Sequence, residues 1–212
     1  MIIICASALL VIPSVGVSQS TAENEEPAVS DAGESEFLES LAKWHAVRNP
    51  SSQHVLLSRL AGEWNVLIRF YGGDRVWETR GTARVDPIHG GRFVLEHMSG
   101  EVFAPNLDGE MQSEAFSATR LLGYDNYQNA YVGVLADNQN THLLSFSGHA
   151  LPGETVRELR LFGVSDEPML EMHGAAMQYV LAFDSEDHYT WTTYAIAVGE
   201  GSKVLEFDYT RR

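Results

Sequence analysis

The feature that most constrains this 212-residue chain is a change of hydrophobic period after Glu63. The first run beyond it alternates polar residues with Trp64, Val66, Ile68 and Phe70. Apolar side chains at every second position indicate a strand with one buried face. Segments of this kind cover residues 64–70, 77–85, 92–102, 113–123, 130–136, 142–149, 155–162, 177–183, 188–198 and 203–210. Gly, Pro, Asn or Asp separates nearly every pair, so we expect an antiparallel meander.

A long meander has to bury one face of each strand and to remove its exposed edges. Closing the sheet into an up-and-down barrel does both. A two-sheet sandwich is consistent with the same alternation, but hairpin-length connections suit a meander and no long Greek-key crossover is evident. We therefore predict an all-β fold, an antiparallel up-and-down β-barrel of about ten strands over residues 62–212.

Two short helices are predicted ahead of the barrel, over residues 36–61. In the first, Phe37, Leu41 and Trp44 recur at helical spacing before Asn49-Pro50 stops the pattern. The second follows a serine N-cap, and Gly62 is placed to end it. Its apolar face consists of Leu56, Leu57 and Leu60. We expect the two helices to cap one end of the barrel.

Residues 1–18 contain no charged side chain, and their apolar run is broken by Pro13. The run is short for a membrane-spanning helix, which needs about twenty apolar residues. The small residues Gly16 and Ser18 suit cleavage after Ser18, so we predict a secretory signal peptide over 1–18, although no Lys or Arg precedes the run. The alternative is an N-terminal membrane anchor. Residues 19–35 are rich in Ser, Ala and Glu, and are predicted to form a disordered acidic linker.

The formal net charge is −15, with two lysines against twelve arginines. Such an acidic chain is expected to be repelled by nucleic acid and by anionic membranes. The one cysteine, Cys5, lies in the predicted leader, so the mature protein would hold no disulfide and no thiolate site. We therefore predict a secreted or periplasmic bacterial protein that binds no nucleic acid and has no stable membrane insertion after signal cleavage. The oligomeric state stays open.

Several stretches together resemble a bacterial family of domains of unknown function, the one numbered 1579. In order, they are HVLL (54–57), LAGEW (60–64), GTA (81–83), GGRF (90–93), LGYDN (122–126), Asp137 and YTR (209–211). The resemblance implies a calycin-like barrel, related in shape to lipocalins and fatty-acid-binding proteins, and implies no particular activity. Members usually carry a tryptophan before the aspartate that matches Asp137, where this chain has Leu135-Ala136, and segment 101–113 is longer than typical.

The tripeptide Gly62-Glu63-Trp64 is also similar to the Gly-x-Trp of the first lipocalin strand, whose Trp packs under an Arg from the last strand. Arg211 shares one face of the final segment with Leu205, Phe207 and Tyr209. We therefore predict that Arg211 stacks on Trp64 and closes the barrel floor, a cation–π contact worth about 0.5–2 kcal/mol. The alternative is that Arg211 is a solvated chain end.

No catalytic residue is assigned, because the chain contains no Gly-x-Ser-x-Gly, His-Glu-x-x-His, P-loop or Gly-x-Gly-x-x-Gly motif. Metal ligands on one strand face need even spacing, whereas His142 and His149 lie seven residues apart. Glu171-Met172-His173 has a usable spacing but lacks a local third ligand. No metal and no cofactor are therefore predicted. A single inward histidine would be enough to hold haem, as in haem-binding barrels of similar shape, and that alternative stays open.

An apolar barrel lining with a few polar groups suits a small hydrophobic or amphipathic ligand. His97 shares parity with Phe93 and Leu95, and His142 shares it with Leu144 and Phe146. We predict a ligand-binding cavity lined by Trp77, Phe93, His97, Tyr124, His142, Phe146, Trp191 and Tyr194. The alternative for each residue is an ordinary place in the core.

The leading hypothesis is thus an exported barrel that binds a small apolar or amphipathic molecule. The second is a cavity enzyme of isomerase or lyase type, with His97 or His142 as the acid–base group. That enzyme would need an inward histidine bonded to a second inward polar group. The third is a filled barrel whose acidic tail or exposed loop meets a protein partner.

Overall fold

The computed structural model describes residues 31–151, 157–167, 171–196 and 202–212. The chain divides into two units, residues 1–40 and 41–212. The predicted signal peptide and residues 19–30 of the predicted linker lie outside the described residues. Helix α1 (Asp31–Arg48) begins at Asp31 rather than at residue 36, so the last residues assigned to the linker are helical. The apolar face expected for this helix is not buried, since Phe37 and Trp44 are exposed.

In the second unit, the short helix α2 (Gln53–Ser58) contacts β3 and β4. It buries Leu56 and Leu57 in the core of the barrel. His54 is buried as well, and its Nδ1 accepts a hydrogen bond from the backbone N–H of Ser51 at 2.9 Å. Gly62, which was expected to end the helix, is the first residue of β1 and has a φ of 136°.

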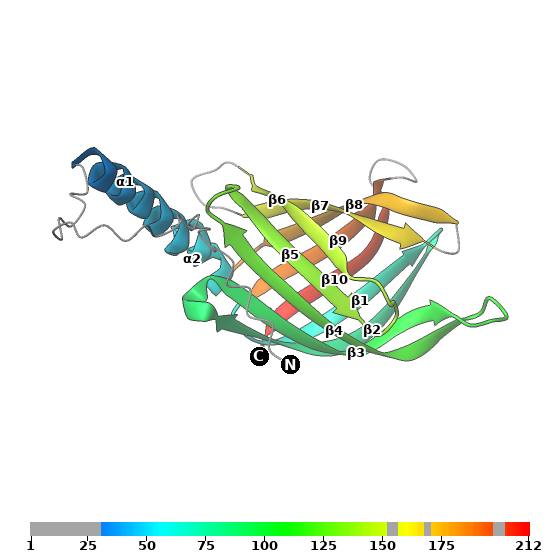
Figure 1. The fold of residues 1–212 in the computed structure, drawn as a ribbon. Helices are drawn as coiled ribbons and strands as arrows, with labels where there is room; N and C mark the ends of the chain where they lie inside the picture. The colour runs from blue at the N-terminus through cyan, green and yellow to red at the C-terminus, as the bar shows by residue number, and fades with distance from the viewer. Residues whose placement is uncertain (1–30, 152–156, 168–170, 197–201) are drawn as a thin grey trace, which may run out of the picture. The chain divides into compact units, whose positions relative to one another are not determined.

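Ten antiparallel strands form the barrel, and a 3-10 turn, η1 (His89–Gly91), joins the second to the third. The strands are β1 (Gly62–Gly72), β2 (Arg75–Ile88), β3 (Phe93–Pro105), β4 (Met111–Asp125), β5 (Ala130–Asp137), β6 (Leu144–Ala150), β7 (Glu158–Glu167), β8 (Met172–Phe183), β9 (His188–Ala195) and β10 (Lys203–Arg211). Each strand pairs with its neighbours in sequence, and β1 pairs with β10 (Figure 1). The predicted up-and-down barrel is confirmed, and the sandwich is wrong.

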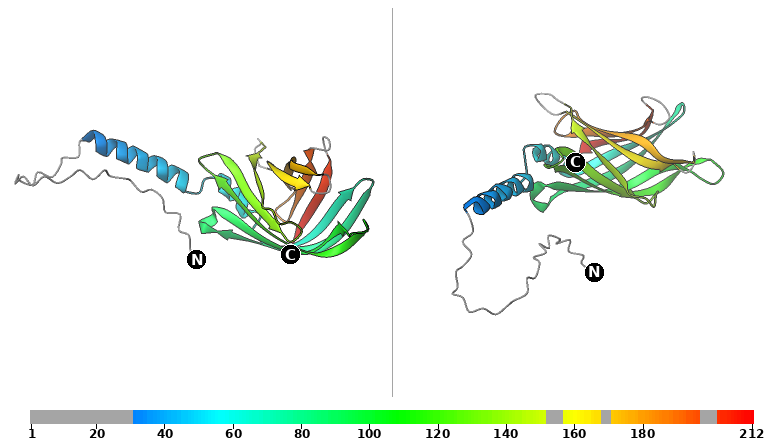
Figure 2. Two further views of the ribbon diagram at one scale, coloured as in Figure 1. Left: turned by 45° about the vertical axis from the view of Figure 1, so that its right-hand side comes forward. Right: turned by 45° about the horizontal axis from the view of Figure 1, so that its top comes forward.

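Strand alternation places the core inside this closed ring. On β1 the buried side chains are Trp64, Val66 and Ile68, as the period of two predicted. The closing pair sets Trp64 opposite Arg211 and Phe70 opposite Leu205. Figure 2 shows the strands curving around one interior, and the buried residues from both ends of the barrel form a single hydrophobic cluster.

Candidate ligand-binding cavity

The barrel contains an apolar cavity of about 440 Å³. It lies toward the strand ends remote from α2, because its lining includes Phe70 near the end of β1 and Pro105 at the end of β3. Its volume is in the range of small-molecule sites. The apolar lining comprises Phe70, Val102, Phe103, Ala104, Pro105, Phe116, Leu135, Leu144, Phe146, Met172, Ala175, Met177, Trp191, Ala195, Val204, Leu205 and Phe207.

The deep wall of the cavity is aromatic. The ring centroid of Phe146 lies 5.1 Å from that of Tyr179 and 5.3 Å from that of Trp191. Phe116 and Phe207 form a stacked pair with centroids 6.1 Å apart. Such contacts give rigid apolar surface on which a planar or aliphatic molecule can pack.

A few polar side chains also line the cavity, among them Ser165, Tyr179 and Thr193. Burial raises the pKa of Tyr179 to about 12, so its hydroxyl stays neutral near pH 7. Asp137 lies where β5 ends, and its Oδ1 accepts the backbone N–H groups of Gln139 and Asn140, each at 2.9 Å. This aspartate therefore organises a turn beside the cavity.

A buried polar layer lies next to the aromatic wall. Arg120 donates to Glu96 and, at 3.2 Å, to Tyr209 Oη, while the Tyr209 hydroxyl donates to Glu96 Oε1 at 2.7 Å. The guanidinium carbon of Arg120 is 3.8 Å from the centroid of the Trp191 ring. Burial opposes the charge of Arg120, but Glu96, together with Tyr209 and Tyr189, outweighs burial and raises the Arg120 pKa above its usual range. The Tyr189 ring stacks on Tyr209 with centroids 4.2 Å apart.

The end of the barrel beside α2 is closed by Trp64 and Arg211. Trp64 is fully buried, and its Nε1 donates to the Leu60 carbonyl at 2.9 Å. The Arg211 guanidinium carbon lies 4.2 Å from the centroid of the Trp64 ring. Arg211 also donates to the Ala61 carbonyl at 2.9 Å and to Asp187 Oδ1 at 2.9 Å. The bond to Ala61 ties the end of β10 to the segment between α2 and β1, and the bond to Asp187 ties it to the turn between β8 and β9.

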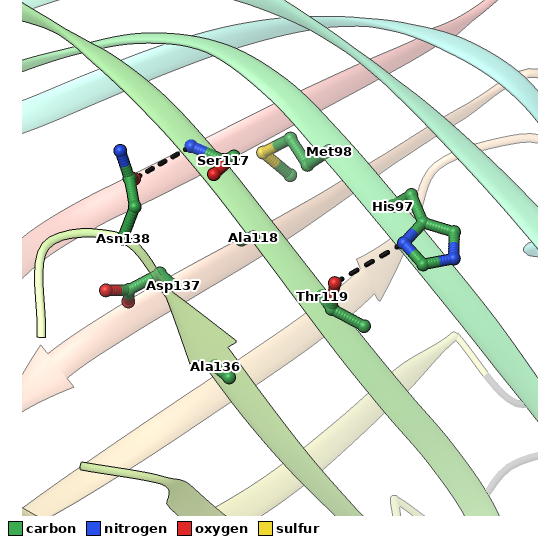
Figure 3. Close-up of a pocket in the computed structure, with 8 residues that line it drawn as sticks. All are labelled: His97, Met98, Ser117, Ala118, Thr119, Ala136, Asp137 and Asn138. Atoms are coloured by element: carbon green, nitrogen blue, oxygen red, sulfur yellow. Dashed lines mark hydrogen bonds between the residues drawn. The ribbon is translucent and has the colours of Figure 1, made fainter. Parts of the chain in front are cut away.

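A second hollow, of about 340 Å³, lies over β3, β4 and the end of β5 (Figure 3). His97 Nδ1 lies 3.3 Å from Thr119 Oγ1, and Asn138 Oδ1 accepts the Ser117 N–H at 2.9 Å. His97, Thr119 and Asn138 are exposed. Because its walls exclude little water, this hollow is a weaker candidate for ligand binding than the cavity.

Two of the residues predicted to bind a ligand, Phe146 and Trp191, line the cavity. The inward orientation expected for Phe93 and His97 is wrong. On β3 the buried side chains are Val94, Glu96 and Met98, so the alternation of the strand turns His97 outward. The cavity enzyme that would use His97 therefore lacks its acid–base group inside the barrel.

The other predicted residues lie outside the cavity lining. Trp77 is half-buried against Phe70, with ring centroids 5.8 Å apart. Tyr124 lies at the α2 end, 5.7 Å from His54 between ring centroids. His142 Nε2 is 3.4 Å from the hydroxyl of Ser165, a lining residue. At the end of β9 the side chains of Thr193 and Ala195, rather than Tyr194, line the cavity.

Sequence reasoning missed most of the lining, including Val102, Phe116, Met177, Tyr179 and Phe207. For Phe207 a signal was available, since it shares parity with Arg211 on the last strand. The barrel is not packed solid, so the filled-barrel hypothesis loses its structural premise.

The stretch LGYDN ends β4 and leads into the turn before β5. Asp125 Oδ1 accepts the backbone N–H groups of Tyr127 at 2.7 Å and Gln128 at 3.0 Å. Asn126 Nδ2 donates to the Asn49 carbonyl at 2.6 Å, just beyond the end of α1. This turn therefore anchors the chain that enters α2.

The outer wall of β1, β9 and β10 carries a half-buried charge network. Arg69 Nη1 donates to Glu206 Oε1 at 2.7 Å and to Asp208 Oδ2 at 3.0 Å. Lys203 donates to Glu206 Oε2 at 2.6 Å, and His188 Nε2 lies 2.8 Å from Asp208 Oδ1. Burial opposes ionisation of Glu206, but Lys203 and Arg69 outweigh it and lower the Glu206 pKa.

Among the described residues, no group of three or more His, Asp or Glu side chains is placed to hold a metal ion. Within the same part of the chain, no helix has the length and hydropathy required to span a membrane.

A closed, ten-stranded, up-and-down barrel with an apolar cavity is consistent with the calycin-like class. The chain belongs to the family described as "Protein of unknown function (DUF1579)", which matches residues 49–211. Among solved structures, the crystal structure of Rv2717c from M. tuberculosis is similar, with a TM-score of 0.53 and 19% sequence identity over 77% of this chain and 99% of that chain. At this identity the likeness concerns the fold alone. None of the curated proteins compared with the chain matches it.

Proposed function

We propose that this protein binds a small hydrophobic or amphipathic molecule in the barrel cavity. The observation that carries the proposal is an apolar cavity of about 440 Å³ in a barrel whose other end is closed by α2, Trp64 and Arg211. Transfer of apolar surface from water into such a cavity stabilises a complex by roughly 25 cal/mol per Å² of buried area. The polar side chains of Tyr179 and Thr193 provide hydrogen-bonding groups for orienting a ligand.

Filling the cavity tests this proposal. Ala175 lines the cavity on β8, and its neighbour Ala176 is exposed. Ala175→Trp should lower the affinity for N-phenyl-naphthylamine, a neutral dye that fluoresces in apolar sites, at least tenfold. Ala176→Trp is the matched control and should leave the affinity unchanged. Equal affinities of the two variants and the parent would show that the dye binds elsewhere. Native mass spectrometry of protein purified from its own host would then identify a co-purified ligand.

We also propose that the protein is exported, on the basis of the uncharged apolar leader over residues 1–18. The expected product begins at Gln19 and is found in the periplasm or the medium. Intact-mass measurement of the protein from each cell fraction tests this. A full-length chain retained in the cytoplasmic or membrane fraction would contradict it.

A further inference from the structure

The charges around the cavity restrict the ligands that it accepts. Among the described residues that line it, Asp137 is the one charged side chain, and no Lys, Arg or His is present. The segments 152–156, 168–170 and 197–201, which lie outside the described residues, contain no Lys, Arg or His in their sequence. An anionic group entering the cavity therefore meets no cationic side chain in its lining.

Arg120 and Lys203 each contact the ring of a lining residue, and each is already paired. Arg120 is the one Lys or Arg that is buried in the described part of the chain, and it lies against Trp191, a lining residue. Its guanidinium is balanced by the buried carboxylate of Glu96. Lys203 lies 5.0 Å from the ring centroid of Tyr71, another lining residue, and its Nζ donates to Glu206 at 2.6 Å.

We infer that the cavity selects uncharged ligands over anionic ones, and that Glu96 sets this selectivity by neutralising Arg120. This inference deepens the proposed function and rests on it. An anion that leaves water for this cavity loses its hydration and gains no free cation in exchange. The net charge of −15 adds a long-range repulsion. Uncharged hydroxyl, ether or amide groups can instead bond to Tyr179 or Thr193.

A matched pair of dyes tests the selectivity in the unmodified protein. N-phenyl-naphthylamine and anilinonaphthalene sulfonate share one aromatic skeleton and differ by the sulfonate. At pH 8, where ordinary histidines are neutral, the Kd of the neutral dye should be at least tenfold lower. Binding of neither dye overturns both the proposed function and this inference. Binding of the sulfonate as tightly as the neutral dye, with both sensitive to Ala175→Trp, overturns the inference and leaves the proposed function intact.

Three variants test the role of Glu96. Glu96→Gln leaves the charge of Arg120 unbalanced, so the ratio of the sulfonate Kd to the neutral-dye Kd should fall at least threefold. Glu101→Gln removes the same charge from an exposed position of β3 and should leave the ratio unchanged. The double variant Glu96→Gln/Arg120→Met removes both charges and should restore the parent ratio. An unchanged ratio in Glu96→Gln, or one lowered equally by Glu101→Gln, overturns the assignment to Glu96. The dye comparison on the parent needs no variant and stands even if Glu96→Gln fails to fold.

Discussion

Arg211 and Trp64 face each other across the β1–β10 pair, with the guanidinium carbon 4.2 Å from the centroid of the indole ring. The same guanidinium donates to the carbonyls of Ala61 and Glu186 and to the carboxylate of Asp187. A buried ring and a well-bonded cation thus share one contact where the first and last strands meet. The contact closes the end of the barrel that lies away from the cavity mouth.

The first prediction concerns the energetic coupling of these two residues. Trp64→Ala should destabilise by about 3–5 kcal/mol, as large core truncations do. Arg211→Ala should also destabilise the barrel. The stability lost by the double variant should be smaller than the sum of the two single losses by about 0.5–2 kcal/mol, since the cation–π contact can be lost only once. Urea denaturation of the four proteins measures the coupling. Arg212→Ala, which alters the neighbouring exposed arginine, is the control. If the stability losses of Trp64→Ala and Arg211→Ala are strictly additive, the two side chains make no stabilising contact.

The second prediction concerns Gly62, whose φ of 136° is rarely adopted by other residues. A Cβ at this position would lie 2.5 Å from Nη1 of Arg211. Gly62→Ala should therefore displace the arginine as well as strain the backbone, with a loss of more than about 1 kcal/mol. Gly73→Ala is the matched control, because Gly73 also has positive φ but has open space around its Cβ. Thermal unfolding should rank Gly62→Ala as the less stable variant, and the reverse order would contradict the steric explanation.

The third prediction concerns the buried Glu96–Arg120 pair. Removing one partner leaves an unbalanced buried charge, so Arg120→Met should destabilise by about 3–5 kcal/mol. Glu96→Gln/Arg120→Met should cost less than that single variant, because no buried charge remains. Chemical denaturation measures the free energy of unfolding of both variants, and an equal or larger loss in the double variant would contradict this expectation. Asp86→Asn, which breaks an exposed ion pair with Arg84, should change stability by less than about 1 kcal/mol.

The fourth prediction concerns the pH dependence due to His188, whose ring nitrogens lie 2.8 Å from Asp184 and 2.8 Å from Asp208. Partial burial opposes its charge, but the two carboxylates outweigh burial and raise the His188 pKa above 6.5. The stabilisation is therefore fully present below pH 6.5 and is lost as the pH rises through the higher folded-state pKa. His188→Gln should lower the Tm more at pH 6 than at pH 9. If the Tm loss caused by His188→Gln is instead larger at pH 9 than at pH 6, the predicted direction of the pH dependence is wrong.

The fold was predictable because the signal for it is distributed along the chain. Each strand repeats the period of two, and turn residues mark most boundaries, so an error at one position does not alter the topology. Helix α1 shows the limit of this reasoning. The helical spacing of Phe37 and Trp44 predicted a buried face, yet both side chains are exposed. Spacing identifies a helix face but does not show that a partner covers it.

The cavity lining was harder to predict because β3 carries apolar side chains on both faces. The parity of His97 with Phe93 and Leu95 indicated that face as the interior, which left Glu96 on the other face. In the folded barrel Glu96 faces inward, where Arg120 balances it. The partner is on another strand, and the pairing is visible only once β3 and β4 are in register. Because Glu96 is buried by this ion pair, the alternation of β3 turns His97 outward, opposite to its predicted orientation.

The β1–β10 pair also has a kinetic consequence. Its residues come from opposite ends of the domain, so the ring closes only through contacts of very long sequence separation, which form slowly. Until then both strands present unpaired backbone edges to solvent. In a concentrated refolding mixture those edges are where one molecule would join the next, and dilution should favour recovery of closed barrels over aggregates.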